Sequence, residues 1–159
     1  MRNSLFLERA HFVKGIDPVA DFADTVQSSD VVSMRGHEKL LAVIHKGVGT
    51  TGTSTITVEA CDDVLPTNTT AIPFRYREMT SGDTPGAITL ATAAGFTTTA
   101  GSSQIYLVEV DAEAVAAAGY SFVRVKMTEV VNSPVLGGML LMLLNPTYEG
   151  AAVPSSVLT

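Results

Sequence analysis

A glycine-rich loop is the first segment of this sequence whose residue types could support chemistry. Residues 45–54, HKGVGTTGTS, contain the lysine and the glycines of a phosphate-binding loop. A P-loop places its lysine directly after the last glycine and before Ser or Thr, at the start of a helix, so that backbone N–H groups surround the phosphates. Here Lys46 precedes the glycines and a strand-like segment follows them. We therefore predict a hairpin tip at this position, not a phosphate site.

The histidines and carboxylates lack the spacing of a metal site. None of His11, His37 and His45 lies in a recognised ligand spacing from another His, Cys or Asp. Asp62 and Asp63 are adjacent at the end of a predicted strand, but the alternating oxygen ligands of an EF-hand do not follow them. Apart from the alternative of a chance calcium site at these two aspartates, we expect no metal and no other cofactor.

Nucleophilic catalysis has no recognisable motif in this chain. The G-x-S-x-G turn that exposes a nucleophilic serine is not present. Glu109, Asp111 and Glu113 are close together, but they span the end of a predicted strand and the start of a predicted helix. Acidic residues at that position stabilise a helix N-terminus, which explains them without a catalytic role. We therefore predict a protein that is not an enzyme.

Short strands separated by turns dominate the pattern from Asp30 onwards. Apolar alternation and continuous apolar runs predict strands over residues 30–34, 38–46, 55–61, 71–79, 87–91, 96–99, 103–111, 120–130 and 137–146. One short helix is predicted near 112–118, with Asp111 placed to cap it and Gly119 to end it. Such a pattern predicts an all-β fold, an antiparallel β-sandwich of the jelly-roll type with about eight strands.

The chain length of 159 residues suits one domain. Residues 1–29 have no clear period, so we predict an N-terminal arm there and a β-sandwich domain over 30–159 that includes a short C-terminal tail. The apolar stretch Leu5–Leu7 is too short for a signal peptide, and no apolar run approaches the roughly 20 residues that span a bilayer. We therefore expect no membrane association.

Charge and cysteine content exclude further classes. The formal net charge is −6, and the ten basic residues are scattered, whereas nucleic-acid binding requires clustered Lys and Arg. Nucleic acid is therefore not an expected partner. The single cysteine, Cys61, allows neither an internal disulfide nor a cysteine-based zinc site, and we expect it to be a small buried apolar residue.

The apolar run Met139–Leu144 suits one of two environments. It matches a strand with both faces buried in the core, or a strand with one face on the core and the other on a second subunit. The low charge and this run together predict a homotrimer, because closed symmetric assemblies bury such faces without open-ended growth. The candidate residues for an interface with another subunit or another protein are Leu5, Phe6, Leu7, Phe12, Met139 and Met142.

The C-terminal third of the chain resembles a known class of viral protein. The segment AEAVAAAGYSFVRVKMTEVVNSPVLGGMLLMLLNPTYE, residues 112–149, has an Ala-rich turn into Gly-Tyr, a long strand, and a glycine-bounded apolar run ending at Asn-Pro. In this it resembles the small head decoration, or cement, proteins of tailed bacteriophages. The resemblance implies a β-sandwich, often a jelly roll and usually trimeric, on the capsid surface. It assigns no contact residue.

Two functions from different classes follow. The first is a virion structural protein, made in the host cytoplasm, that binds the major capsid protein on the head surface and stabilises the shell by bridging its subunits. The alternative is a receptor- or carbohydrate-binding β-sandwich module of a phage tail or fibre. A cupin-like enzyme is disfavoured, because only His45 of the three histidines lies in a predicted strand.

Overall fold

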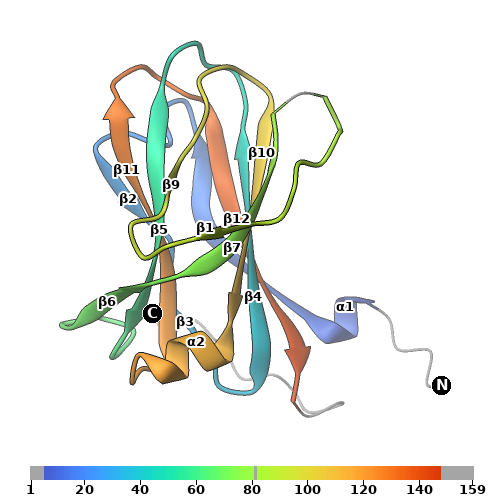
Figure 1. Cartoon of the computed structure of the whole chain (residues 1–159), viewed down its shortest axis with the longest axis vertical. Helices are drawn as coiled ribbons and strands as arrows, with labels where there is room; N and C mark the ends of the chain where they lie inside the picture. The colour runs from blue at the N-terminus through green and yellow to red at the C-terminus, as the bar shows by residue number, and fades with distance from the viewer. Residues whose placement is uncertain (1–5, 81, 148–159) are drawn as a thin grey trace.

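Two antiparallel sheets packed face to face form the fold in the computed structural model, which describes residues 6–80 and 82–147 (Figure 1). Sheet A consists, in spatial order, of β1 (Ala10–Val19), β12 (Gly137–Pro146), β4 (His37–Lys46), β10 (Gln104–Asp111), β7 (Phe74–Met79) and β8 (Thr89–Ala91). Sheet B consists of β2 (Val26–Ser28), β11 (Phe122–Val131), β5 (Thr53–Cys61) and β6 (Thr69–Ile72), with β3 (Val32–Ser33) paired to β11 and β9 (Phe96–Thr97) paired to β5. The predicted all-β sandwich is thereby confirmed.

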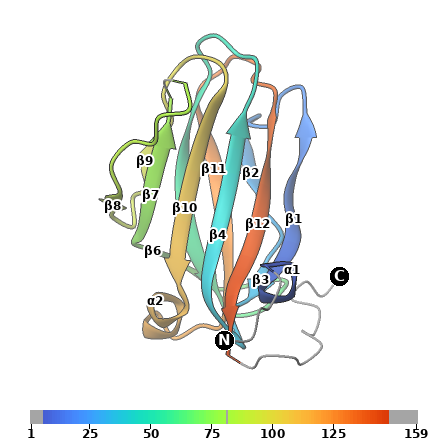
Figure 2. The same cartoon turned by 90° about the vertical axis from the view of Figure 1, so that its right-hand side faces the viewer.

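Eight of these strands are wound as a jelly roll. The pairs β1 with β12, β2 with β11, β4 with β10, and β5 with β6 are nested, as in one long hairpin folded over itself. Pairing of β12 with β4 and of β11 with β5 then closes the two sheets. Figure 2 shows the strands of sheet A side by side, with β7 and β8 extending the sheet beyond β10. The sheet's long central strands therefore present one face to the core and one to the outside.

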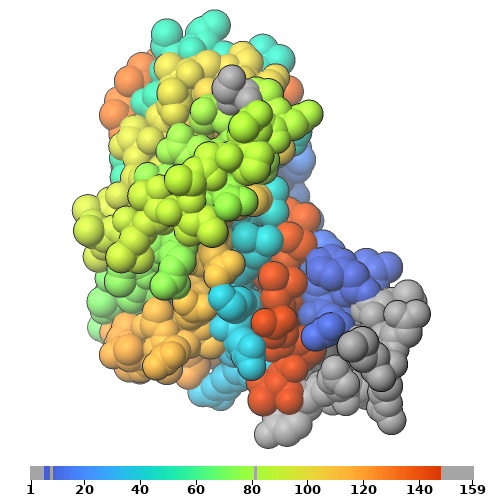
Figure 3. All heavy atoms as spheres, turned by 45° about the vertical axis from the view of Figure 1, so that its right-hand side comes forward, coloured from blue at the N-terminus to red at the C-terminus, as the bar shows by residue number. Residues whose placement is uncertain are grey.

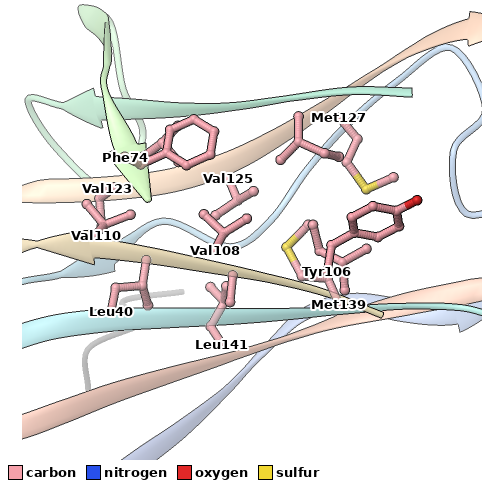
Figure 4. Packing of buried hydrophobic residues seen from close by; sticks show 14 of the residues in the cluster. Leu40, Phe74, Tyr106, Val108, Val110, Val123, Val125, Met127, Met139 and Leu141 are labelled. Atoms are coloured by element: carbon pink, nitrogen blue, oxygen red, sulfur yellow. The ribbon is translucent and has the colours of Figure 1, made fainter. Parts of the chain in front are cut away.

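The core lies between the sheets because inward positions recur at every second residue. Leu40, Ala42 and Ile44 of β4 are fully buried, and Leu141 of β12 faces the same layer. Figure 4 shows these inner faces meeting the inner face of sheet B, where Val125 lies opposite. The core contains aliphatic residues along most of its length, with a cluster of aromatic rings beside β7 and β9.

The N-terminal arm predicted over 1–29 differs from the structure. Residues 10–19 form edge strand β1, and residues 26–28 form β2, so both belong to the sandwich. The alternation of β1 is interrupted because its pairing with β12 shifts register between Lys14 and Ile16 and again between Ile16 and Val19. Bulges of this kind move apolar residues out of a period of two, which hid the strand in the sequence.

Two further predictions, one about a strand and one about a hairpin, are also corrected. The segment 71–79 is not one strand: it is divided at Pro73, with β6 in sheet B and β7 in sheet A, since proline donates no ladder hydrogen bond. The expected hairpin tip at 47–52 instead connects β4 of sheet A to β5 of sheet B. Lys46, which is buried, fixes this connection by donating to the carbonyl oxygens of Gly52 (2.8 Å) and Thr99 (2.6 Å). Burial lowers the pKa of Lys46.

The one predicted helix is present as α2 (Ala112–Ala117), and Gly119 follows it with φ +85°. Asp111 occupies the N-cap position as predicted, but its side chain makes no capping hydrogen bond. Its carboxylate instead contacts Lys39 Nζ and Arg75 Nη1, each at 3.1 Å. A second short helix, α1 (Phe6–Arg9), precedes β1. Within residues 6–80 and 82–147, no helix has the length and apolar content needed to cross a membrane.

Candidate interaction surface

The two outer faces of the sandwich differ in chemistry. On sheet B, the outward positions of β5 and β11 hold threonines and a compact charged cluster. Glu59 accepts from Arg124 (2.6 Å) and Lys126 (3.2 Å). Partial burial acts to raise the pKa of Glu59, but the hydrogen bonds from Arg124 and Lys126 outweigh it and lower the pKa overall. This polar face is typical of one that water covers.

The outer face of sheet A is apolar across its central strands. Because directly paired residues of neighbouring strands project to the same side, the register defines rows of side chains across the sheet. One row runs Lys14, Leu140, Val43, Leu107, Arg77, over β1, β12, β4, β10 and β7. Three consecutive apolar residues therefore lie between two basic ends, and the Leu140 side chain is 40% exposed.

A second row lies two residues further along the strands, on the same face of the sheet. It runs Phe12, Met142, Leu41, Glu109, Arg75, Leu90. Phe12 is 42% exposed, and the ring of Phe6 in α1 contacts it edge to face, with centroids 6.3 Å apart. The two rows place seven apolar side chains on the outside of the protein; six of them are adjacent, and Leu90 is separated from Leu41 by Glu109 and Arg75. We call these seven residues, Phe12, Leu41, Val43, Leu90, Leu107, Leu140 and Met142, the sheet A patch.

The sheet A patch lies between raised borders. In Figure 3, β4 and β12 lie between the chain around residues 82–91 on one side and the N-terminal segment on the other. A hollow of about 540 Å³ is lined mainly by apolar groups that include Ile16, Pro18, Val43, Leu136 and Leu140. A second hollow of about 240 Å³ lies over β10 and β7 and is lined by residues that include Leu41, Arg77, Ile88 and Leu107. Protruding side chains of a partner can enter both.

The charges around the sheet A patch are mostly paired within the chain. Lys39 Nζ contacts Glu109 at 2.6 Å, and hydrogen bonds with Glu109 and then Asp111 raise the pKa of Lys39. Lys14 contacts Asp17 at 2.8 Å. Arg77 is different: its Nε is shielded from solvent and has no hydrogen-bond partner in the part of the chain that the structure describes. A buried guanidinium N–H without an acceptor is costly, so Arg77 lowers the stability of this face.

The interface residues predicted from sequence have different environments. Phe12 and Met142 are cross-strand neighbours in the sheet A patch, and Phe6 packs on Phe12. Leu7 is exposed on α1. Met139 is 4% exposed and faces the core, as Figure 4 shows, so it is not available on the surface. Leu5 lies outside the described residues.

Several residues of the sheet A patch were not among those predicted. Leu41, Val43 and Leu107 lie in the segments EKLLAVIHK and SQIYLVEVD, where both the inward and the outward positions are apolar. That pattern is typical of strands buried on both faces. The structure covers only one of the two faces, so the signal for an interface was present in the sequence but could not be separated from burial in the core.

Two of the three histidines, His11 and His37, lie side by side, and they do not form a metal site. The rings of His11 and His37 stack with centroids 6.4 Å apart, and His45 lies at the other end of β4. Among residues 6–80 and 82–147, no group of three or more His, Cys, Asp or Glu side chains is arranged to hold a metal ion. Asp62 accepts hydrogen bonds from Thr67 and Asn68, which lower its pKa to about 2 and order the loop after β5.

The His37 ring gives the fold a dependence on pH. Burial, and then the neighbouring His11, lower the pKa of His37 from 6.5. The unfolded chain therefore binds this proton more readily, and stability is lost as the pH falls through 6.5. We expect the melting temperature to fall between pH 7 and pH 5 in the wild type and to fall less in His37→Phe. Exposed His45 provides the matched control, since His45→Phe should keep the wild-type dependence; equal slopes in all three proteins would contradict the assignment.

Comparisons with protein-family models, curated proteins and solved structures find no match to this chain. The strand order and the exposed residues of sheet A define the class of the protein as an antiparallel β-sandwich of jelly-roll topology with one apolar outer face.

Proposed function

We propose that this protein is a virion structural protein that decorates the head of a tailed bacteriophage and stabilises the shell by bridging capsid subunits. The observation that carries the proposal is the sheet A patch, an apolar face on a rigid antiparallel sandwich whose other outer face is polar. The segment 112–149 that resembles decoration proteins forms α2, β11 and β12, and β12 supplies Leu140 and Met142 to the sheet A patch.

The proposed partners are the major capsid protein and further copies of this chain in a homotrimer. A trimer on a capsid lattice makes several equivalent contacts at once, so each contact can be small while the trimer as a whole binds tightly. The function needs a stiff scaffold and contact surfaces rather than a reactive group. A jelly roll with two tightly paired sheets supplies the scaffold, and its place in the virion is the outer surface of the shell.

The thermal stability of empty expanded shells tests the proposal. Shells purified without this protein should melt at a higher temperature once the protein is added back. A protein that binds the assembled shell, and not the dissociated subunits, stabilises the shell by mass action. The increase should saturate with added protein. An unrelated β-sandwich of similar charge is the control. A shell whose melting is unchanged at saturating concentrations would overturn the proposal and favour a receptor- or carbohydrate-binding role on a tail or fibre.

A further inference from the structure

We propose that His11 and His37 form a lock on the N-terminal edge of sheet A, and that acidification opens it, releasing residues 6–14 and withdrawing Phe12 from the sheet A patch. We call the two histidines the histidine lock. Its effect on shell binding rests on the proposed function, whereas the lock itself can be measured on the protein alone. Four features support the inference: the contact of the two rings, the burial of His37, the charges around the pair and the bulge in β1.

The two rings join segments that are distant in the sequence. His11 lies in β1, and His37 is the first residue of β4, directly after the turn at Gly36. Their ring centroids are 6.4 Å apart, with 29° between the ring planes. His11 is paired with the buried Leu143 of β12, so its side chain projects toward the inner face of sheet A. The contact therefore ties the edge strand to the turn that begins β4.

The His37 ring is held in a place that suits only its neutral form. The residue is 5% exposed, and its Nδ1 is shielded from solvent without a hydrogen-bond partner in the described part of the chain. A protonated ring donates from both nitrogens, so protonation buries a charge together with an unpartnered N–H. Burial and then His11 lower the pKa of His37, and a contact with the backbone of Arg35 acts in the opposite direction without outweighing them.

The charged groups around the histidine lock do not compensate a protonated ring. Arg9 at the end of α1 and Arg35 in the turn before β4 are themselves basic. Glu38, which follows His37, accepts a hydrogen bond from Asn145 Nδ2 at 3.4 Å. Among the side chains that the structure describes, neither ring forms an ion pair with a carboxylate. Two protonated rings at this separation therefore repel each other without a counter-charge in contact.

The segment that the lock holds is separable from the rest of β1. In the described sheet, β1 pairs only with β12 because it lies at the edge, and Figure 2 shows α1 beside it at that edge. The pairing shifts register between Lys14 and Ile16, which interrupts the ladder after residue 14. Segments bounded in this way open as local units, at a lower free energy than the whole domain.

Opening of the segment is coupled to uptake of a proton. Once β1 leaves, water reaches the His37 ring, and its pKa returns from the lowered value to the ordinary 6.5. The closed form therefore has its full advantage above pH 6.5 and loses it as the pH falls below 6.5. For one proton, the opening equilibrium rises by up to about 10-fold for each pH unit, until the pKa of the closed form is reached.

The sheet A patch changes when the segment opens. Phe12 follows His11 directly and is paired with Met142, and the ring of Phe6 packs on Phe12. Release of residues 6–14 removes both aromatic rings from the outer face of sheet A. Because the apparent affinity of a binding surface falls with the fraction of protein that is competent to bind, acidification weakens the contact that the patch makes.

Hydrogen exchange at pH 7 and pH 5 tests the lock. Protection factors correct for the intrinsic effect of pH on exchange, and edge strand β6 (Thr69–Ile72) is the internal control. Between pH 7 and pH 5, protection of residues 10–14 should fall by about 5-fold or more, and protection of β6 should change by less than about 2-fold. In His37→Phe, and likewise in His11→Phe, the fall at residues 10–14 should be reduced to about 2-fold or less. His45→Phe, which changes an exposed ring of β4, should behave as the wild type. Circular dichroism verifies that each variant is folded.

Binding to shells at the same two pH values tests the consequence. The dissociation constant of the wild type should be at least about 3-fold higher at pH 5 than at pH 7, and that of His37→Phe should differ by less than about 2-fold on the same shells. Protection at residues 10–14 that is independent of pH, or that falls equally in His37→Phe, overturns the lock and leaves the shell-binding role intact. Equal wild-type affinity at both pH values overturns the regulation of binding. A pH-dependent opening in a protein that binds shells at neither pH supports the lock and overturns the decoration function.

Discussion

Replacing Leu141 with alanine is expected to lower the free energy of unfolding by about 3 kcal/mol, since truncating a buried leucine removes apolar contacts and leaves a cavity. The Leu141 side chain is fully buried on the inner face of β12, and Figure 4 shows it beside Val108 in the centre of the sandwich. Denaturant unfolding monitored by circular dichroism measures the change. The slope of the transition should remain that of the wild type, because the sheets stay paired.

Leu140→Ala is the matched control for that prediction. Leu140 is the preceding residue of the same strand, carries the same side chain and is 40% exposed on the opposite face. In protein dilute enough to be monomeric, its truncation should cost less than about 1 kcal/mol, as for other surface substitutions. Equal losses at positions 140 and 141 in dilute protein would contradict the assignment of the two faces.

Deleting residues 1–19 is expected to abolish cooperative folding. The deletion removes β1, which pairs with β12 along most of its length, and with it the buried Val13 and the packed Ile16. It also leaves β12 as an unpaired edge with an apolar outer row. Domains of this size have only about 5–15 kcal/mol of stability, so we expect too little to remain once an entire strand and its buried side chains are removed.

Deleting residues 1–9 provides the comparison. This shorter deletion removes α1 and keeps β1, which begins at Ala10. We expect it to retain a cooperative melting transition, because among the described residues it removes the contact between Phe6 and Phe12 but no strand. Thermal unfolding followed by circular dichroism distinguishes the two proteins. A 1–19 deletion that melts cooperatively at the wild-type temperature is incompatible with β1 as part of the sandwich.

Much of the strand content was predictable because the central strands are rich in branched and aliphatic residues. The segments that form β4, β10, β11 and β12 were predicted to within two residues at each end. β1 was missed, since Gly15 approaches the backbone of Met139 too closely for a side chain and lies at the bulge that shifts the register. That close approach depends on a strand more than 120 residues away in the sequence, so no local pattern reports it.

The candidate surface was predictable only in part. Phe12 is predicted as an interface residue because it belongs to an apolar cluster in an N-terminal segment without a clear period, and Met142 because it lies in the apolar run Met139–Leu144. Met139 was assigned with them, but the period of two places it on the inner face with Leu141. Side chains alternate between the two faces of a strand, and the sheet packed against the strand decides which alternate set faces outward. An apolar run carries no information on that choice, whereas the register across β12 and β4 does.

Binding of the purified protein to expanded shells that lack it is the most direct measurement of the central claim. The wild type and the control Thr128→Asp, which places a charge on the polar outer face of sheet B, should bind to a saturating level, measured by sedimenting the shells and quantifying the bound protein. The bound number should be a multiple of three for each equivalent lattice position. Leu140→Asp should bind much more weakly, because it places an unpaired charge on the apolar sheet A patch that is proposed to contact the shell. Binding that fails to saturate, or no binding of the wild type at all, would contradict the account.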